Sequence, residues 1–390
     1  MTKLLKISGI LLLQALVQLS FMQTAFSQSV NLSVSNMTAS RLTSSAANSP
    51  SVNILDTNDS SKNKSSVNKS STNELNKKQT ALKQPKSQWF EKAFAVMGTQ
   101  AKVEFEWHDE KQAEQLIQQV IAEMHRIDQL MSPYKPASEL SLINRQAAVK
   151  ATVISPELFR LIEKSLYFSQ LTRGAFDISF SSVGYLYDFR EHKKPTIKQI
   201  EQLKGAINFH NIQLDKQKHS IFFSDKRVKI DLGGIAKGYA VDQCMAILMR
   251  AGVKNAYINA GGDSRIIGKK HDRLWYIGIQ HPRDDKKLLA NLPLEAVAVS
   301  TSGDYERYFE TEGVRYHHII NPKTGDSVRA IRSTTILAKD STTADALSTS
   351  IFVLGVSEGM KLINSMPDVS AIMVDKNGKL FVSEDLAAVE

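Results

Sequence analysis

Residues 28–88 place the strongest constraint on how this 390-residue chain can fold. The stretch consists mainly of Ser, Asn, Thr, Lys and Gln and contains few large apolar side chains. Such a segment cannot bury enough apolar surface to offset the conformational entropy that folding removes. We therefore predict a disordered linker over residues 28–88, so the folded domain must be built from residues 89–390.

The first 27 residues are typical of an export signal. Lys3 and Lys6 form a basic start, residues 7–19 are mostly apolar, and the small residues of "AFS" at 25–27 have the spacing of a cleavage site. The apolar run is short for a membrane span of about 20 residues, although an uncleaved anchor would also fit it. We expect an exported, periplasmic protein, either released or held at the inner membrane by an uncleaved signal segment.

The positive charge of the chain lies almost entirely in this leading region. The net charge is +9, and residues 1–88 contribute +7 through nine Lys, one Arg and three acidic residues. The rest of the chain is close to neutral, so we expect no nucleic-acid partner. The single cysteine, Cys244, excludes an intrachain disulfide and falls in an apolar helical run where we expect it to be buried.

Two helices are predicted in the first half of the remaining chain. Residues 94–107 alternate like a strand, and residues 108–131 follow with apolar side chains at helical spacing, namely Leu116, Ile117, Val120, Ile121, Met124 and Ile127. A second helix is expected to begin after an N-cap at Ser155, with Pro156 in its first turn, and to end before Gly174.

Strands and helices also alternate in the second half. We expect a helix over residues 234–252 between strands at 228–231 and 255–260, and a hairpin over 371–383 that turns at Asn377 and Gly378. Because strands occur both as hairpins and around helices, the sequence favours an α+β fold, with helices packed on mixed or antiparallel sheets in one large domain.

Two glycine pairs interrupt these elements. Gly233 and Gly234 precede a helix that begins near Lys237, and main-chain amides at such a helix start would suit a phosphate. Gly261 and Gly262 form a similar break. The first pattern is neither a Walker A motif nor a dinucleotide-binding motif, so on pattern alone a tight strand-to-helix turn with an exposed lysine is the favoured explanation.

Two adjacent histidines, His317 and His318, precede a turn built on Asn321, Pro322 and Gly325. Alternation along a strand would place the two imidazoles on opposite faces, so only one is expected to face a given cleft. A histidine there could accept a proton from a hydroxyl at neutral pH. No closely spaced set of thiolates and imidazoles accompanies them, which disfavours a zinc site.

The segment "DSTTADALSTSIFVLG", residues 340–355, is predicted to be an apolar helix with a polar first turn. Asp345 and Thr349 lie four residues apart and therefore on one face. Capping explains part of this pattern, with Ser341 or Thr342 as N-cap and an acid favoured by the helix dipole. The same oxygens, together with main-chain carbonyls, are ligands that Mg²⁺ accepts when phosphate supplies the rest.

An ordered set of motifs in this chain resembles the ApbE family, the FAD:protein FMN transferases. The motifs are "MGT" at 97–99, "SPYKPASELSLIN" at 132–144, "GAFDIS" at 174–179, "DLGGIAKGYAVD" at 231–242, "NAGGD" at 259–263, "STSGDYERYF" at 300–309, "HHIINPKTG" at 317–325 and "ADALST" at 344–349. Each motif alone is weak, but together and in this order they are specific.

The resemblance implies roles for particular residues. It implies FAD contacts at Met97, Tyr134, Ala175, Phe176, Asp177, Asp231, Lys237 and Ile320. It implies a Mg²⁺ site at Gly234, Asp345, Ser348 and Thr349, with the carbonyl as the ligand at Gly234, and it implies His318 as the catalytic base. The family usually has Asp where Asn321 stands, and Ala or Asp where Ser348 stands.

The activity implied by the resemblance is Mg²⁺-dependent transfer of FMN from FAD to a Thr or Ser hydroxyl of an acceptor flavoprotein, with release of AMP. The implied partners are FAD as substrate and an acceptor that belongs to a membrane redox complex, and a homodimer is compatible. Two alternatives stay open from the sequence: a Mg²⁺-dependent FAD pyrophosphatase that releases FMN and AMP, and a non-catalytic periplasmic flavin-binding protein.

Overall fold

The computed structural model describes residues 86–387, and it confirms the predicted α+β class. The export signal predicted over 1–27, and the predicted linker up to residue 85, lie outside the described residues. The first strand begins at Gln88, next to the start predicted for the folded domain.

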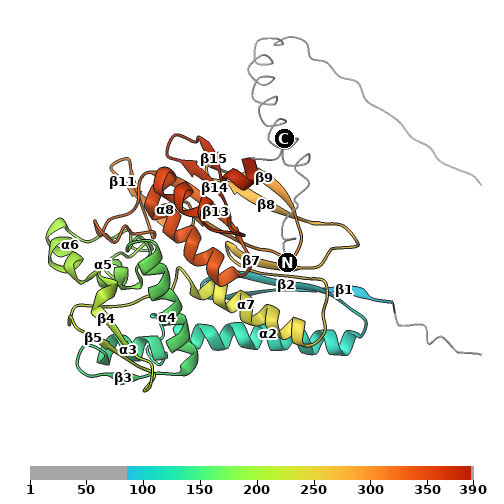
Figure 1. Cartoon of the computed structure of the whole chain (residues 1–390), viewed down its shortest axis with the longest axis horizontal. Coiled ribbons are helices and arrows are strands. Elements are labelled where there is room, and N and C mark those ends of the chain that lie inside the picture. Colours follow the sequence, from blue (N-terminus) through green and yellow to red (C-terminus); the bar gives the residue numbers. More distant parts are fainter. Residues whose placement is uncertain (1–85, 388–390) are drawn as a thin grey trace, which may run out of the picture. The chain divides into compact units, whose positions relative to one another are not determined.

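An antiparallel eight-stranded sheet organises this region (Figure 1). Its spatial order is β1-β2-β6-β7-β10-β13-β14-β15, and every neighbouring pair is antiparallel. The strands are β1 (Gln88–Val96), β2 (Thr99–Trp107), β6 (Ala256–Ala260), β7 (Asp263–Ile267), β10 (Ala298–Gly303), β13 (Ile331–Ala338), β14 (Ser370–Asp375) and β15 (Leu380–Val382). The sheet therefore joins the two ends of the described chain.

Three helices cover one face of this sheet, and a hairpin covers part of the other. The helices are α2 (Glu110–Met131), α7 (Ala236–Arg250) and α8 (Ser341–Asn364), which share the largest apolar core with the inward side chains of the strands (Figure 1). The hairpin is β8 (Trp275–His281) and β9 (Asp284–Leu294), which packs on the opposite face in a second apolar cluster. Each face of the sheet therefore has its own core.

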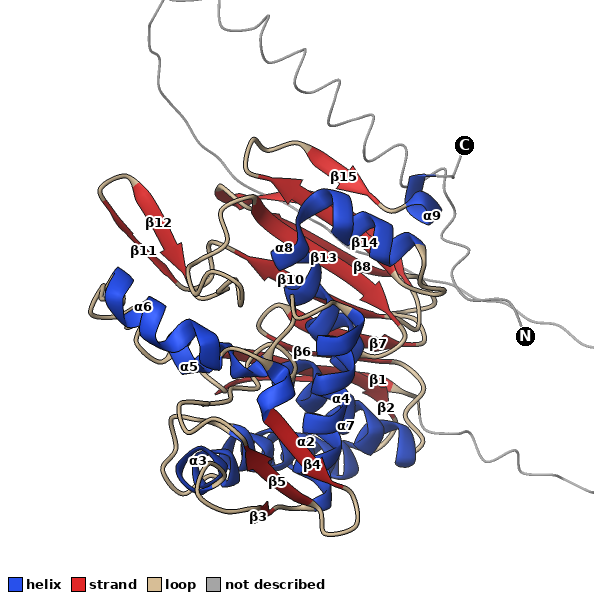
Figure 2. Ribbon diagram, turned by 60° about the vertical axis from the view of Figure 1, so that its left-hand side comes forward, coloured by secondary structure: helices blue, strands red, loops and turns tan. Residues whose placement is uncertain are grey.

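The remaining elements form smaller units beside the sheet (Figure 2). They are α3 (Glu139–Gln146), α4 (Pro156–Leu171), α5 (Ser181–Gly184), α6 (Ile197–Leu203), α9 (Glu384–Ala387), the three-stranded sheet of β3 (Thr152–Val153), β5 (Ser220–Phe223) and β4 (Ile212–Asp215), and the hairpin of β11 (Tyr308–Thr311) and β12 (Val314–His317). Figure 2 shows the β11–β12 hairpin standing apart from the main sheet.

Several local predictions are confirmed. The N-cap at Ser155 accepts a hydrogen bond from the Leu158 amide, and Pro156 opens α4. Most of the predicted apolar residues of α2 are buried, and Ile121 packs against the core half-buried. Cys244 is fully buried, and its thiol donates to the Val120 carbonyl at 3.5 Å. The hairpin of β14 and β15 turns through Gly378, whose φ is 86°.

Two local predictions are wrong. The strand predicted over 94–107 is two strands, because Met97 and Gly98 adopt positive φ values of 53° and 73° and reverse the chain. Residues 228–231 form no strand, because the Ile230 main chain is bonded to the side-chain amide of Asn144 instead of a neighbouring strand. The break predicted at Gly261 and Gly262 is present, and it forms the β6–β7 hairpin turn.

Helix α8 differs from its prediction at both ends. Its N-cap is Asp340, not Ser341 or Thr342, because the Asp340 carboxylate accepts from the Thr343 amide at 2.8 Å. Gly355, with φ of 80°, breaks the helical geometry within the element. By length and composition α8 could cross a membrane, but it packs on the sheet as a core helix.

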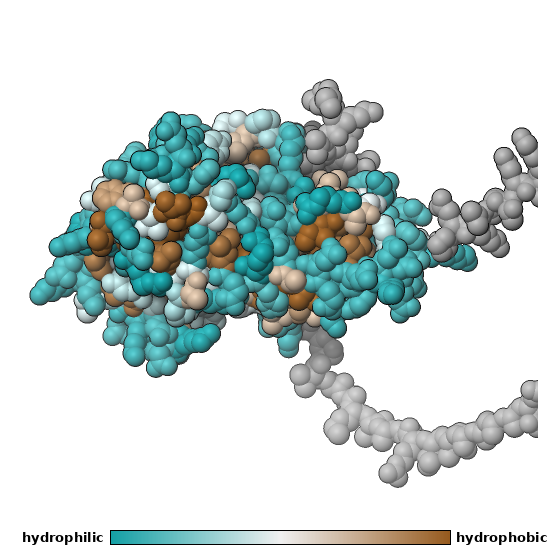
Figure 3. All heavy atoms as spheres, turned by 90° about the horizontal axis from the view of Figure 1, so that it is seen from below, coloured by the Kyte–Doolittle hydropathy of each residue, from teal (hydrophilic) through white to brown (hydrophobic). Residues whose placement is uncertain are grey.

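On the face seen in Figure 3, apolar residues form separate patches divided by hydrophilic ones.

Candidate active site

The first turns of α7 and α8 cross at a very close contact. A Cβ atom on Gly238 of α7 would lie 2.2 Å from the main-chain oxygen of Ser341 and 2.7 Å from Cβ of Asp345. The Gly238 amide donates to Oδ2 of Asp345 at 2.9 Å. Glycine is therefore required for the two helix starts to approach this closely.

Asp242, one turn further along α7, holds the start of α8 in place. Its carboxylate accepts from the amides of Ser341 and Thr342 at 3.0 and 2.8 Å and from the Thr342 hydroxyl at 2.5 Å. Arg265 on β7 donates to the same carboxylate at 2.8 Å. Because the first amides of a helix lack intrahelical partners, Asp242 caps α8 from a neighbouring element.

A lysine and two carboxylates form the floor of the site. Nζ of Lys237 lies 2.5 Å from Asp263 on β7 and 3.5 Å from Asp345 on α8. Burial lowers the pKa of Lys237, but the two carboxylates more than offset this and raise it above its ordinary value. Burial and the neighbouring Asp263 charge raise the pKa of Asp345. One cation therefore faces two buried carboxylates, so this floor can take further positive charge.

Hydroxyl groups line the wall beside this floor. Ser300 donates to Asp263 at 2.6 Å, and its oxygen lies 3.1 Å from that of Ser348. Ser302 lies 2.8 Å from the Ser348 hydroxyl and 3.4 Å from that of Thr349. The Ser348 carbonyl accepts from the Thr334 hydroxyl. Strand β10 and helix α8 thus present a continuous row of hard oxygen donors.

Gly234 places main chain directly against this row. A Cβ atom there would lie 3.2 Å from Oγ1 of Thr349 and 3.2 Å from Cε2 of Phe176. The structure therefore places Gly234 against Thr349, which lies one helical turn after Asp345 on α8. Within residues 86–387 no group of three His, Cys, Asp or Glu side chains could hold a metal by themselves.

The two histidines have different environments. His317 is 2% exposed, its Nε2 lies 2.5 Å from the Val328 carbonyl, and its Nδ1 accepts from the Ile319 amide at 3.3 Å. His318 lies just past the end of β12, and its Nδ1 is buried without a hydrogen-bond partner in the described chain. Burial, His317 and the cations of Arg307 and Lys237 lower the pKa of His318 to about 3.

This difference gives the two histidines different roles: His317 is structural, and His318 is available to accept a proton. Both ring nitrogens of His317 are engaged with main chain, so its imidazole is fixed in the core. His318 is neutral at physiological pH and keeps an unengaged ring nitrogen near the lysine of the floor. A proton acceptor requires such a nitrogen.

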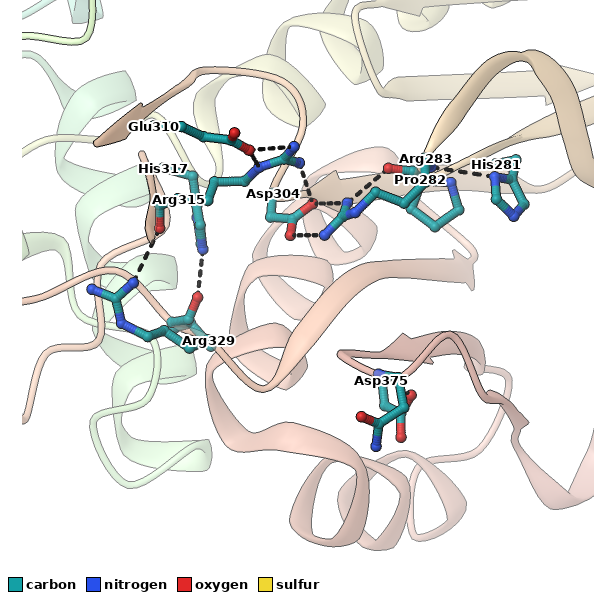
Figure 4. A network of polar contacts seen from close by, with 11 residues as sticks. His281, Pro282, Arg283, Asp304, Glu310, Arg315, His317, Arg329 and Asp375 are labelled. Carbon is teal, nitrogen blue, oxygen red and sulfur yellow. Dashed lines mark hydrogen bonds and ion pairs between the residues drawn. The ribbon is translucent and has the colours of Figure 1, made fainter. Parts of the chain in front are cut away.

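The β11–β12 hairpin that leads to His318 is tied down by ion pairs (Figure 4). Arg283, in the β8–β9 turn, donates two hydrogen bonds of 2.7 Å to Asp304 at the end of β10. Arg315 on β12 lies 3.5 Å from Asp304 and 2.8 Å from Glu310. Asp304 therefore joins both hairpins to the end of β10.

The predicted FAD contacts lie at different depths. Tyr134 is 81% exposed, whereas Ala175, Phe176 and Ile320 are buried. Met97 occupies the β1–β2 turn with φ of 53°. These positions offer both an open ring and an apolar wall.

The two predicted acidic contacts are already bonded to protein. Oδ1 of Asp177 accepts from the amide and hydroxyl of Ser179, and Oδ2 accepts from the Phe209 amide at 2.9 Å. Oδ1 of Asp231 accepts from the Gly233 amide at 2.6 Å, and burial raises its pKa. Oδ2 of Asp177 accepts one hydrogen bond and can accept a second, so a ligand donor can still reach this carboxylate.

Comparison with known proteins supports the interpretation of this geometry. Residues 97–373 match the model of the ApbE family. This match spans all the elements that form the site, from the β1–β2 turn to β14.

The chain belongs to the ApbE family.

Two similar proteins carry the same functional description. A FAD:protein FMN transferase of Klebsiella pneumoniae is 30% identical over 292 residues, which cover 74% of this chain and 90% of that protein. One of Treponema pallidum is 28% identical over 304 residues, covering 73% and 84%. The ApbE protein of Thermotoga maritima has a TM-score of 0.71 at 34% identity, covering 78% of this chain and 99% of that one. The structure of the flavin transferase ApbE of Vibrio cholerae has a TM-score of 0.70 at 25% identity, and the match covers 78% of this chain and 99% of that one.

Sequence reasoning missed several residues of this ApbE site. Asp263, Ser300 and Ser302 complete the floor and wall, and Asp242 caps α8. Arg307 lies near them, with its Nη2 3.3 Å from a Cβ built on Gly98, and its carbonyl accepts from the His318 amide at 3.1 Å. In the described chain its guanidinium makes no ion pair. All but Asp242 lie in or at the edge of strands whose side chains meet only when the sheet forms.

Proposed function

We propose that this chain transfers FMN from FAD to a Thr or Ser hydroxyl of an acceptor flavoprotein and releases AMP. Family membership and the relatives described above support flavin transfer. One observation in the structure carries the proposal: a buried imidazole nitrogen without a partner lies near a floor of one lysine, two carboxylates and several hydroxyls. Phosphoryl transfer needs this combination of a base and charge stabilisation.

The donor set fits a bound Mg²⁺. Asp345, the Thr349 hydroxyl and the Gly234 carbonyl would hold it, and the Ser348 position lies in the same row. These are hard oxygen ligands, too few to complete a coordination shell without phosphate and water. When bound, the metal supplies positive charge against the pyrophosphate.

The chain's own residues would carry the remaining steps. Lys237 and Arg307 attract the pyrophosphate of FAD, and Nδ1 of His318 accepts the proton of the acceptor hydroxyl. The hydroxyl oxygen attacks the FMN phosphorus as the bond to the AMP phosphate oxygen breaks, so a phosphoester forms and AMP leaves. An anion next to His318 raises its pKa from the low value of the free enzyme, which makes it a stronger base once substrate is bound.

FAD is proposed to lie between the β1–β2 turn and the segment around Phe176. Met97, Tyr134, Ala175, Phe176, Asp177, Asp231, Lys237 and Ile320 are the proposed contacts. The exposed ring of Tyr134 offers a stacking surface, and Phe176 touches the Gly234 turn, where phosphate would meet the start of α7.

The setting of this reaction is also a proposal. The predicted export signal supports a periplasmic location, and we propose an acceptor subunit of a membrane redox complex as the protein substrate. A homodimer is compatible with this function and is not required by it.

The test is to incubate the purified protein with FAD, Mg²⁺ and a soluble candidate acceptor domain. The acceptor's intact mass and the free FMN are then measured. A gain of one FMN unit on the acceptor supports the transferase. Release of FMN without a mass gain would indicate a pyrophosphatase, and FAD binding without either product would indicate a flavin-binding protein.

A further inference from the structure

Asp263 is a buried carboxylate to which the proposed reaction gives no direct role. Its side chain is 2% exposed, and it opens β7 directly opposite Ser300 of β10 in the antiparallel ladder. Charged side chains are rarely buried to this extent unless they are paired. Both partners of Asp263 belong to the candidate active site, so its role follows from what it holds there.

The two oxygens of Asp263 have separate partners. Oδ1 accepts from the Ser300 hydroxyl at 2.6 Å, and Oδ2 accepts from Nζ of Lys237 at 2.5 Å. Residues directly opposite each other in an antiparallel pair project from the same face of the sheet, so the ladder itself brings Ser300 to the carboxylate. Ser300 therefore orients Asp263, and the second oxygen faces the lysine.

The oxygens of Asp345 are engaged differently. Oδ2 accepts from the Gly238 amide at 2.9 Å. Oδ1 lies 3.5 Å from Nζ of Lys237, a long contact compared with the 2.5 Å bond that the same ammonium makes to Asp263. Oδ1 is therefore the oxygen of Asp345 that stays open to a cation, and Lys237 is the residue that could close it.

One ammonium thus stands between two carboxylates that compete for it. A lysine carries three donors on a flexible stem, so it pairs with the carboxylate that attracts it more strongly. In the described chain, Asp263 and Asp345 are the two acids that form ion pairs with Lys237, and the contact to Asp263 is the shorter one. Without the charge of Asp263, the ammonium would turn to Asp345.

We propose that Asp263 is a positioning residue, which holds Lys237 away from Asp345 so that Oδ1 of Asp345 stays open to Mg²⁺ and the ammonium stays directed at the FAD pyrophosphate. This role rests on the proposed function, since it requires Mg²⁺ and FAD at this site. Asp263 acts without touching either of them, because both of its oxygens are engaged by protein.

The test is Asp263→Asn, which keeps the size of the side chain and an oxygen for Ser300 but removes the charge that holds Lys237. Mg²⁺ is titrated into the protein with excess FAD, and its Kd is measured by calorimetry. We expect this Kd to rise at least about tenfold, because the ammonium then competes for Asp345. Transfer at low Mg²⁺ should fall to a similar extent and recover in part at high Mg²⁺.

Lys237→Met separates this role from a direct effect of the Asp263 charge on the metal. In that background no ammonium is left to move, so adding Asp263→Asn should change the Kd for Mg²⁺ by no more than about twofold. A rise of similar size in both backgrounds would overturn the proposal, because Asp263 would then act on the metal without the lysine.

Asp368→Asn is the matched control. It breaks a contact of 2.6 Å to Lys339, a pair outside the site, and should leave the Kd for Mg²⁺ unchanged.

Ser300→Ala is a second variant, and circular dichroism measures the fold of each protein. It removes the hydroxyl that orients Asp263, so the Kd for Mg²⁺ should rise by about threefold. An unchanged Kd in Asp263→Asn, or in Ser300→Ala if Asp263→Asn does not fold, overturns the inference while the proposed function stands. Absence of transfer by the wild type instead overturns the proposed function itself.

Discussion

The crossing of α7 with α8 and the hairpin that leads to His318 build the two halves of the site in different ways. At the crossing, Gly238 touches the Ser341 main chain and Asp242 caps α8, and both contacts are buried. The hairpin is held instead by Arg283, Asp304 and Arg315, whose arginines are partly exposed. Close packing fixes the geometry of the α7–α8 crossing, and charge pairing holds the hairpin in position.

This contrast suggests a division of roles. Ligands for a cation and a pyrophosphate must keep a fixed spacing, which dense packing of two helices provides. A base must meet a hydroxyl delivered by another protein, and partly exposed ion pairs allow small adjustments at modest cost. Changes at the crossing should therefore have larger effects than changes in the hairpin.

Asp345→Ala should have the largest effect, a loss of transfer of about 10³-fold. The change removes the only formally charged oxygen among the proposed metal ligands, while the fold largely survives. Transfer of FMN to the acceptor at saturating Mg²⁺ measures the loss, and circular dichroism measures the fold. Substantially unchanged Mg²⁺-dependent activity would contradict the metal assignment.

Gly238→Ala tests the packing of the crossing itself. An added methyl group would meet the Ser341 main-chain oxygen at 2.2 Å, so the helices must separate. We expect a loss of about 3 kcal/mol in the free energy of unfolding, measured with denaturant. Gly205→Ala is the control, since a Cβ there has only the Arg227 side chain at 3.7 Å. Equal stability of the two variants would show that the helices tolerate separation.

Sequence reasoning succeeded where the signal was local. The caps and apolar spacing of α2 and α4 lie within each helix, and the turn at Gly378 lies within its hairpin. The turn at Met97 was missed because a positive φ at a non-glycine residue leaves no compositional mark. Residues 228–231 were misassigned because their partner, Asn144, lies 86 residues away in the chain.

Within the candidate site, too, some features were predicted from the sequence and others depend on distant partners. The ApbE motifs predicted a shared site for Gly234, Asp345 and Thr349, and the structure places Gly234 against Thr349. Alternation predicted that only one of His317 and His318 faces a given cleft, and the motifs assigned that role to His318, the one with an unpartnered ring nitrogen. Asp263 could not be assigned from its motif alone, because its role depends on Lys237 reaching it across 26 residues of sequence. Such pairs become visible only once the sheet order is known.

His318→Ala should keep FAD binding and lose transfer by at least about a hundredfold, because an aliphatic hydroxyl needs a positioned base at neutral pH. His317→Ala should lose far less transfer, and it should lose stability instead, because two hydrogen bonds to main chain disappear. Flavin fluorescence measures binding, and acceptor mass measures transfer. Equal losses of transfer, or the reverse order, would show that the wrong imidazole is assigned or that proton removal does not limit the rate.

Arg283→Ala should have the smallest effect, a loss of transfer of up to about tenfold with FAD binding unchanged. It removes a bidentate pair to Asp304, but Arg315 still contacts that carboxylate, so the hairpin keeps part of its anchor. If the pair orients His318, Arg283→Lys should recover part of the rate, since one ion pair can re-form. A loss as large as that of His318→Ala would mean that the hairpin, like the helix crossing, requires exact placement.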